Sequence, residues 1–102
     1  MLEHAVAATT LLGRRTLDEF SADRDNTFAV LYALQVVGEA ARGVSAELKS
    51  SYPEVPWRQV IGTRDRIVHG YQRVDLTLVW QIVRIQLPLL IEQVRAVLEE
   101  ES

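Results

Sequence analysis

Hydrophobic residues recur at helical spacing along most of this chain. Between residues 27 and 43 the apolar positions follow one another at steps of three and four residues: Val30, Leu34, Val37, Ala41 and Val44. This repeat is typical of an amphipathic helix with one face in a core. A second ridge of the same helix mixes aromatic and polar side chains: Phe28, Tyr32, Gln35, Glu39 and Arg42. No stretch alternates between apolar and polar positions long enough to predict a strand.

The pattern predicts four main helices, over residues 2–13, 27–43, 57–69 and 76–98. Short polar motifs predict where helices begin and end. Thr16 and Glu19 form a capping-box pair that opens a brief helical turn, and Ser45 can cap the short segment AELKSS. The remaining expected boundaries are Asp25 or Asn26 at the start of 27–43, Gly70 at the end of 57–69, and Asp75 before 76–98.

The last predicted helix is apolar over more than half of its circumference. One stripe carries Leu76, Trp80, Val83, Leu87, Leu90, Val94 and Val97, and a second carries Leu78, Ile82, Ile85 and Leu89. One face of a small bundle cannot cover both stripes, so this helix is either central or also part of a subunit interface. Pro88 should bend it.

Composition places the chain among ordinary globular domains. It has 102 residues, 48% of them hydrophobic and 25% charged, which fits one domain over 1–102. The absence of cysteine excludes disulfides and thiolate metal sites, and two distant histidines without clustered carboxylates predict no metal site. No apolar run is long enough to cross a bilayer and no secretion signal is evident, so we expect a cytoplasmic protein without a membrane partner.

One segment is basic although the chain as a whole has a net charge of −3. Residues 57–73 hold one acid, Asp65, and four arginines: Arg58, Arg64, Arg66 and Arg73. This local excess of positive charge has two interpretations, a solvated helix face or a site that binds anions through guanidinium groups.

On a helix over 57–69, Arg64 falls within an apolar arc that includes Val60 and Ile67. A guanidinium there needs a partner such as Glu39, a position at the edge of the bundle, or a wet cleft. His69 lies about 140° around the same helix, four residues after Asp65, whose carboxylate could orient the imidazole. His69 is therefore either a favourable charge near the helix end or a proton-transfer group.

The string Arg64-Asp65-Arg66-Ile67-Val68-His69-Gly70-Tyr71 resembles the signature of HEPN domains. It is more narrowly similar to the HepT-like toxins, in which an arginine, four residues, a histidine, one residue and a tyrosine follow one another. The resemblance covers about Leu17 to Leu98. The segments around the motif that also match are VGEAA (37–41), YPEVPW (52–57), VIGTRDRIVHGY (60–71) and LPLL (87–90). Members of this family usually have asparagine where Asp65 stands.

The resemblance implies an all-α fold, a HEPN-type four-helix bundle with additional short helices. It also implies a homodimer or higher homo-oligomer that cuts RNA without a metal or other cofactor. Arg64 and His69 would be the catalytic residues, with Asp65 and Arg66 as auxiliary ones. A minimal nucleotidyltransferase antitoxin would silence the toxin by transferring AMP to Tyr71. On residue pattern alone, Tyr71 could instead continue the apolar stripe into the core.

The helical wheel adds an expectation about assembly. Arg64 and His69 point about 140° apart on a regular helix, so one chain would not aim both at one phosphate. A twofold dimer could place both residues of both chains around a shared groove, unless the helix unwinds near Gly70. Two other functions remain open: a non-catalytic partner subunit of a nucleotidyltransferase that binds nucleotide or protein through the same groove, and a purely structural dimer.

Overall fold

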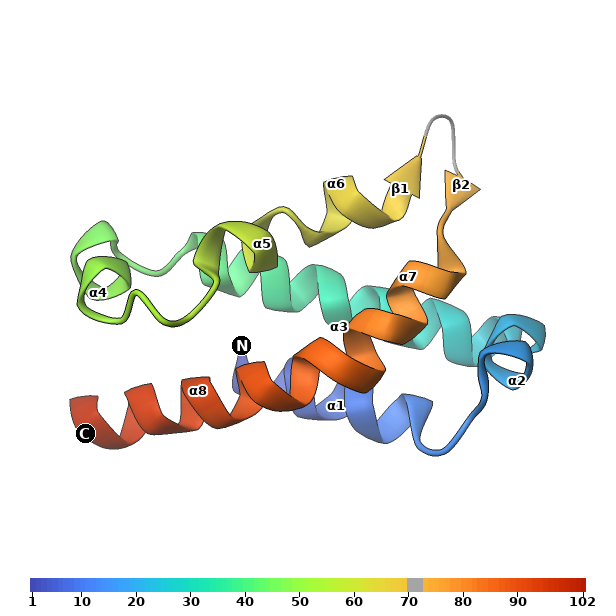
Figure 1. Ribbon diagram of the computed structural model, residues 1–102, viewed down its shortest axis with the longest axis horizontal. Helices are drawn as coiled ribbons and strands as arrows, with labels where there is room; N and C mark the ends of the chain where they lie inside the picture. Colours follow the sequence, from blue (N-terminus) through green and yellow to red (C-terminus); the bar gives the residue numbers. More distant parts are fainter. Residues whose placement is uncertain (70–72) are drawn as a thin grey trace.

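Three long helical segments build the core of the protein. The structure is a computed structural model that describes residues 1–69 and 73–102. Helix α1 (Leu2–Leu12) packs against α3 (Arg24–Arg42), and α8 (Leu87–Glu101) packs against α1. Figure 1 shows α3 running through the middle of the molecule, with α1 and α8 on one side of it. This part of the fold is all-α, as the hydrophobic pattern predicted.

Shorter elements occupy the other side and the ends of α3. Helices α5 (Trp57–Ile61) and α6 (Thr63–Ile67) contact α3 and lead into a two-stranded hairpin, β1 (Val68–His69) with β2 (Arg73–Val74). Helix α2 (Leu17–Ala22) lies near one end of α3 and α4 (Ala46–Ser51) near the other (Figure 1). The chain then forms α7 (Leu76–Gln81), the π-helix η1 (Ile82–Gln86) and α8.

The predicted apolar stripes form this core. On α3, Val30, Leu34, Val37 and Ala41 are buried, while the mixed ridge from Phe28 to Arg42 is exposed. The last helical segment buries Val83, Leu87, Leu90, Val94 and Val97. Its second stripe divides, because Ile82 is buried whereas Ile85 and Leu89 are 66% and 58% exposed. In the described part of the chain, no helix combines the length and the apolar character that a membrane span requires.

Most of the predicted caps are present. The capping box joins Thr16 and Glu19, and Ser45 and Asp75 accept hydrogen bonds from the backbone N–H groups of Leu48 and Leu78. The expected cap of α3 was wrong, because the helix begins earlier, at Arg24. Asp23 accepts from the backbone N–H of Asn26, whose side chain donates to the carbonyl of Leu11 at 2.7 Å.

The helix predicted over 57–69 is wrong in two places. It breaks at Gly62, a residue of low helix propensity whose ψ of 6° lies outside the α-helical range. It then ends at Ile67, because Val68 is extended and β1 pairs with β2 in the antiparallel register Val68↔Val74 and His69↔Arg73. The backbone N–H of Asp75 also donates to the carbonyl of Ile67, at 2.7 Å. Gly70, the expected end of the helix, lies outside the described residues.

The last helix departs from a regular α-helix just before Pro88. Proline has no N–H to donate to the carbonyl four residues earlier, so the helix next to it is free to adopt another hydrogen-bonding pattern. The structure has the π-helix η1 there, with the N–H of Leu87 donating to the carbonyl of Ile82. Figure 1 shows the direction of the segment changing between α7 and α8, the bend expected from Pro88.

Candidate functional site

Arg64 is exposed on α6, beside a hollow between α3 and α6. We call this the α3–α6 hollow; it measures about 340 Å³, and its lining residues are Leu34, Gln35, Gly38, Glu39, Arg42, Ile61, Arg64 and Asp65. Of the placements expected for this guanidinium, an open hollow at the edge of the bundle is the one observed. The buried positions of α5 and α6 are Val60, Thr63 and Ile67, which keep helical spacing, and Arg64 lies at the edge of the face that they form.

A second hollow adjoins the first at Arg64 and Gln35. This hairpin hollow, of about 160 Å³, is lined by Leu31, Leu34, Gln35, Thr63, Arg64, Ile67, Val68 and Val74. Its walls are largely apolar, whereas charged residues line the α3–α6 hollow. The Arg64 guanidinium therefore stands where a polar hollow meets an apolar one, an arrangement suited to a ligand with both a phosphate and a flat apolar body.

The charges around Arg64 are nearly balanced. Arg42 and Arg64 line the α3–α6 hollow together with Glu39 and Asp65. The carboxylate of Glu39 lies 3.9 Å from Nε of Arg42, so Glu39 contacts Arg42 rather than Arg64. Among residues 1–69 and 73–102, neither Arg64 nor Asp65 has a side-chain hydrogen bond or ion pair. The guanidinium of Arg64 is thus available to an anion.

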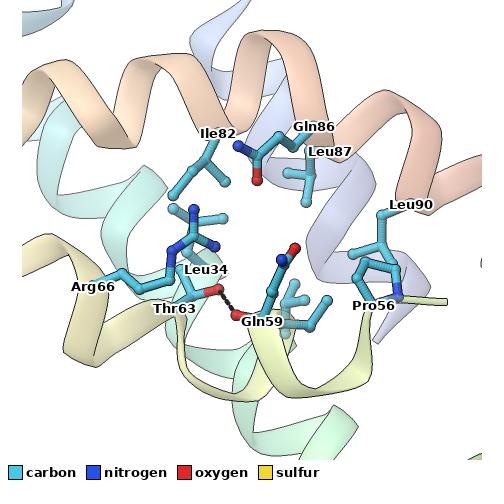
Figure 2. A pocket seen from close by; sticks show the side chains of 11 residues that line it. Leu34, Pro56, Gln59, Thr63, Arg66, Ile82, Gln86, Leu87 and Leu90 are labelled. Atoms are coloured by element: carbon cyan, nitrogen blue, oxygen red, sulfur yellow. Dashed lines mark hydrogen bonds between the residues drawn. The ribbon is translucent and has the colours of Figure 1, made fainter.

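Arg66 lies in a different place from Arg64. It lines a small pocket of about 40 Å³ between α5–α6 and η1–α8, which is otherwise mostly apolar. Figure 2 shows Arg66 entering this Arg66 pocket from α6, with the side chains of Gln59 and Gln86 beside it. The two arginines of the motif are therefore not brought together.

His69 is the last residue of β1, and its backbone pairs with Arg73 of β2. The side chain of His69 lies outside the described part of the structure, as does Tyr71. The angle of 140° expected between Arg64 and His69 does not apply, because the helix ends two residues before His69 and the chain continues extended. The alternative that the helix unwinds at its C-terminal end is the one observed, at Ile67 rather than at Gly70.

Three residues near the motif were not among the sequence-based site candidates. Gln35 and Arg42 line the α3–α6 hollow from α3, and exposed Arg73 lies opposite His69 in the hairpin. The polar end of the ridge from Phe28 to Arg42 was a signal for the first two, because helical spacing places them on the face where α6 packs. Within the described residues, no group of three histidine or acidic side chains is placed to hold a metal ion.

Comparison with known proteins decides the family. The family model described as ribonuclease HepT-like matches residues 1–97. The chain belongs to the HepT-like ribonuclease family. No solved structure matches the chain.

Three curated relatives of this HepT-like chain show how far the similarity extends. The "Probable ribonuclease HepT" of Thermococcus cleftensis is 36% identical over 72% of this chain and 66% of its own length. A "Putative RNase" of Caldanaerobacter subterraneus subsp. tengcongensis is 29% identical over 99% of this chain and 94% of its own. A "Putative RNase" of Methanocaldococcus jannaschii is 32% identical over 78% of this chain and 73% of its own.

Proposed function

We propose that this protein is a metal-independent endoribonuclease in which Arg64 and His69 carry the chemistry. One observation carries the proposal: in a chain of the HepT-like ribonuclease family, Arg64 is exposed, has no hydrogen-bond or ion-pair partner among the described side chains, and is open to two hollows. The chain leads from Arg64 through one helical turn into the extended strand that ends with His69. A phosphate at Arg64 would lie near the first residues of the hairpin.

The reaction divides between the two side chains. His69 accepts the proton of a ribose 2′-hydroxyl, and the 2′-oxygen attacks the adjacent phosphorus. The bond from phosphorus to the 5′-oxygen breaks, and this oxygen leaves with a proton supplied by an imidazolium or by water. Arg64 donates paired N–H bonds to the phosphate oxygens, whose negative charge increases in the transition state. The products are a 2′,3′-cyclic phosphate and a 5′-hydroxyl.

Asp65 and Arg66 are auxiliary in this proposal. Asp65 lines the same hollow as Arg64 and is exposed, so its negative charge opposes a second phosphate there. This charge is also the observation that favours a second candidate function, a non-catalytic subunit that binds a nucleotidyltransferase. Arg66 lies in a separate pocket, where it would hold α6 in position rather than bind the phosphate.

We further propose that the protein is a cytoplasmic toxin that a minimal nucleotidyltransferase antitoxin silences. The antitoxin would transfer AMP from ATP to the Tyr71 hydroxyl, forming an oxygen–phosphorus bond and releasing pyrophosphate. The added phosphodiester would compete with RNA for Arg64 and fill space beside the motif. Tyr71→Phe should keep the ribonuclease activity and lose the silencing. An AMP label on Tyr32 or Tyr52 by mass spectrometry would contradict this account.

The products of cleavage test the ribonuclease proposal. The purified protein is incubated with an unmodified RNA and with the same sequence carrying 2′-O-methyl groups. We expect cyclic phosphate ends from the first and no cleavage of the second, because the 2′-oxygen is the attacking group. Cleavage of the methylated strand, or 3′-hydroxyl ends, would contradict the mechanism. Intact RNA in both reactions would favour the non-catalytic candidate.

A further inference from the structure

A third hollow lies next to the α3–α6 hollow, at the end of the molecule where α3 ends. It measures about 490 Å³ and is formed by α3, α4 and α5 with the start of α6. Its lining residues are Arg42, Lys49, Trp57, Arg58, Ile61, Gly62 and Asp65. We call it the basic hollow, because three of these side chains are cationic and one is acidic.

The cations of the basic hollow are open to a ligand. Among the described residues, the side chains of Lys49 and Arg58 make no hydrogen bond or ion pair. In the described part of the chain, Arg42 has one side-chain ion pair, its exposed contact with Glu39 at 3.9 Å, and such surface pairs contribute little to stability. The three positive charges come from three separate helices, so they surround the hollow rather than forming one stripe.

The basic hollow continues the path that begins at the motif. It shares Arg42, Ile61 and Asp65 with the α3–α6 hollow, which in turn shares Arg64 with the hairpin hollow. In Figure 1 the hairpin, α6, α5 and α4 follow one another along one side of α3. The three hollows therefore form a series of adjoining hollows from the start of β1, at Val68, to α4.

We propose that the basic hollow binds the phosphate backbone of the RNA strand whose scissile phosphate lies at Arg64. This inference rests on the proposed ribonuclease function and adds a second subsite for the same strand. Single-stranded RNA presents one negative charge per nucleotide, and open guanidinium and ammonium groups bind these charges without reading sequence.

The composition of the hollow favours RNA over an acidic protein. Protein interfaces usually contain an apolar centre. Among the described residues, the large exposed apolar side chains lie outside the basic hollow, at Phe28, Tyr32, Val74, Ile85, Leu89 and Leu98. Of the residues that line the basic hollow, only Trp57 and Ile61 are large and apolar, and both are partly buried.

Asp65 is the one acid that lines the basic hollow and also lines the α3–α6 hollow. Its carboxylate therefore lies between the two proposed phosphate positions. Neutralising it with Asp65→Asn should strengthen RNA binding, because one repulsive charge is removed while the shape of the side chain is kept.

The test is the salt dependence of RNA binding. A fluorescent 2′-O-methyl RNA of twelve nucleotides is titrated with the wild type and with Lys49→Ser/Arg58→Ser at several salt concentrations. Each phosphate contact with a single strand contributes about 0.7 to the slope of log affinity against log salt. Two lost contacts should lower this slope by about 1.4. The control, Arg14→Ser/Arg95→Ser, removes two exposed arginines outside all three hollows and should keep the wild-type slope.

The outcomes separate this inference from the proposed function. Equal slopes for the two double variants, or no binding of RNA by the wild type, would overturn the subsite. A lower slope for Lys49→Ser/Arg58→Ser alone would support it, and Asp65→Asn should then bind more tightly than the wild type. If the wild type binds in this way but leaves unmodified RNA uncut, the subsite stands and the ribonuclease proposal fails.

Discussion

Arg64 and Arg66 are two residues apart on α6 and line different pockets. Arg64 opens onto the α3–α6 hollow, together with Gln35 and Asp65. Arg66 enters a pocket of about 40 Å³ on the side of η1 and α8, together with Gln59 and Gln86 (Figure 2). Two arginines of one short motif therefore have separate roles in this account: Arg64 binds the reacting phosphate, and Arg66 positions α6.

Replacing these arginines one at a time should lower the RNA cleavage activity by unequal amounts. We expect Arg64→Ala to lower kcat/KM for RNA cleavage by about 10²–10³-fold, since it removes donors to the transition state. Arg66→Ala should lower it by less than about ten-fold, because it only loosens the packing of α6. Steady-state kinetics on one RNA substrate, with circular dichroism to confirm folding, measures both. Equal losses would contradict the separation of roles.

Gly38 places α3 directly against α5. A Cβ atom at this position would lie 3.3 Å from the carbonyl oxygen of Val60 and 3.6 Å from that of Ile61. These carbonyls belong to the helix that precedes Arg64, so a side chain at position 38 would push α5 and α6 away from α3. Backbone groups of a packed helix cannot move aside as a side chain can.

Gly38→Ala should therefore destabilise the protein although alanine favours helices. Overpacking lowers the free energy of unfolding by about 1–3 kcal/mol, and the higher helix propensity of alanine raises it by about 1 kcal/mol relative to glycine. We expect a net loss of about 1 kcal/mol, measured by urea unfolding, and reduced RNA cleavage because Arg64 is displaced. Gly43→Ala is the control, because its nearest neighbour lies at 3.5 Å and its φ is −76°. A stabilised Gly38→Ala protein would contradict the close approach.

Tyr52 links the loop before α5 to the end of α8. Its hydroxyl donates to Oε2 of Glu101 at 2.5 Å, and its carbonyl accepts from the indole of Trp57. The hydrogen bond to Glu101 and the burial of Tyr52 raise the pKa of its phenol above the usual value of about 10. The folded state holds this proton more tightly than the unfolded chain does.

The pH dependence of stability follows from this raised pKa. The contribution of Tyr52 to the free energy of unfolding is fully present below pH about 10. It is lost as the pH rises from there toward the raised pKa of the phenol. Tm should therefore fall less steeply between pH 9 and 11 in Tyr52→Phe than in the wild type. Tyr32→Phe, at an exposed tyrosine, is the control. If plots of Tm against pH ran parallel for the wild type and Tyr52→Phe, they would contradict the coupling between Tyr52 deprotonation and unfolding.

The exposed stripe of the last helical segment should form the homodimer. Ile85 and Leu89 are more than half exposed and lie one turn apart, on the second of the two apolar stripes predicted for this helix. We expect the wild type to be dimeric, and Ile85→Glu/Leu89→Glu to be monomeric, by light scattering at micromolar concentration. Phe28→Glu/Tyr32→Glu charges the other exposed apolar face, on α3, and should stay dimeric. If Phe28→Glu/Tyr32→Glu alone were monomeric, the result would contradict an interface on the last helical segment and indicate one on α3.

Much of the fold was predictable from local signals. Capping residues such as Thr16, Ser45 and Asp75 act through hydrogen bonds within three positions, and the buried stripe of α3 repeats at helical spacing. Such signals are contained in short stretches of sequence. They predicted the helical class and most boundaries to within a few residues.

The hairpin at the motif could not be predicted in this way. β1 and β2 have two residues each, too few for an alternating pattern, and Val68 becomes extended only because Val74 pairs with it from six positions away. Arg64 is exposed because Thr63 and Ile67 face the core, and a pattern of apolar residues does not assign a buried position to a threonine. The motif could thus be recognised in the sequence, whereas the positions of its residues in the structure depended on contacts between separate segments.

The central claim is that Arg64 and His69 cleave RNA without a metal, and one cleavage assay tests it most directly. The wild type, Arg64→Ala and His69→Ala are incubated with the same RNA, each with and without excess EDTA, after circular dichroism has confirmed their folding. The account predicts equal cleavage by the wild type in both conditions and cleavage slower by at least about 100-fold with either variant. Undiminished cleavage by a folded His69→Ala protein, or loss of wild-type cleavage in EDTA, would contradict it.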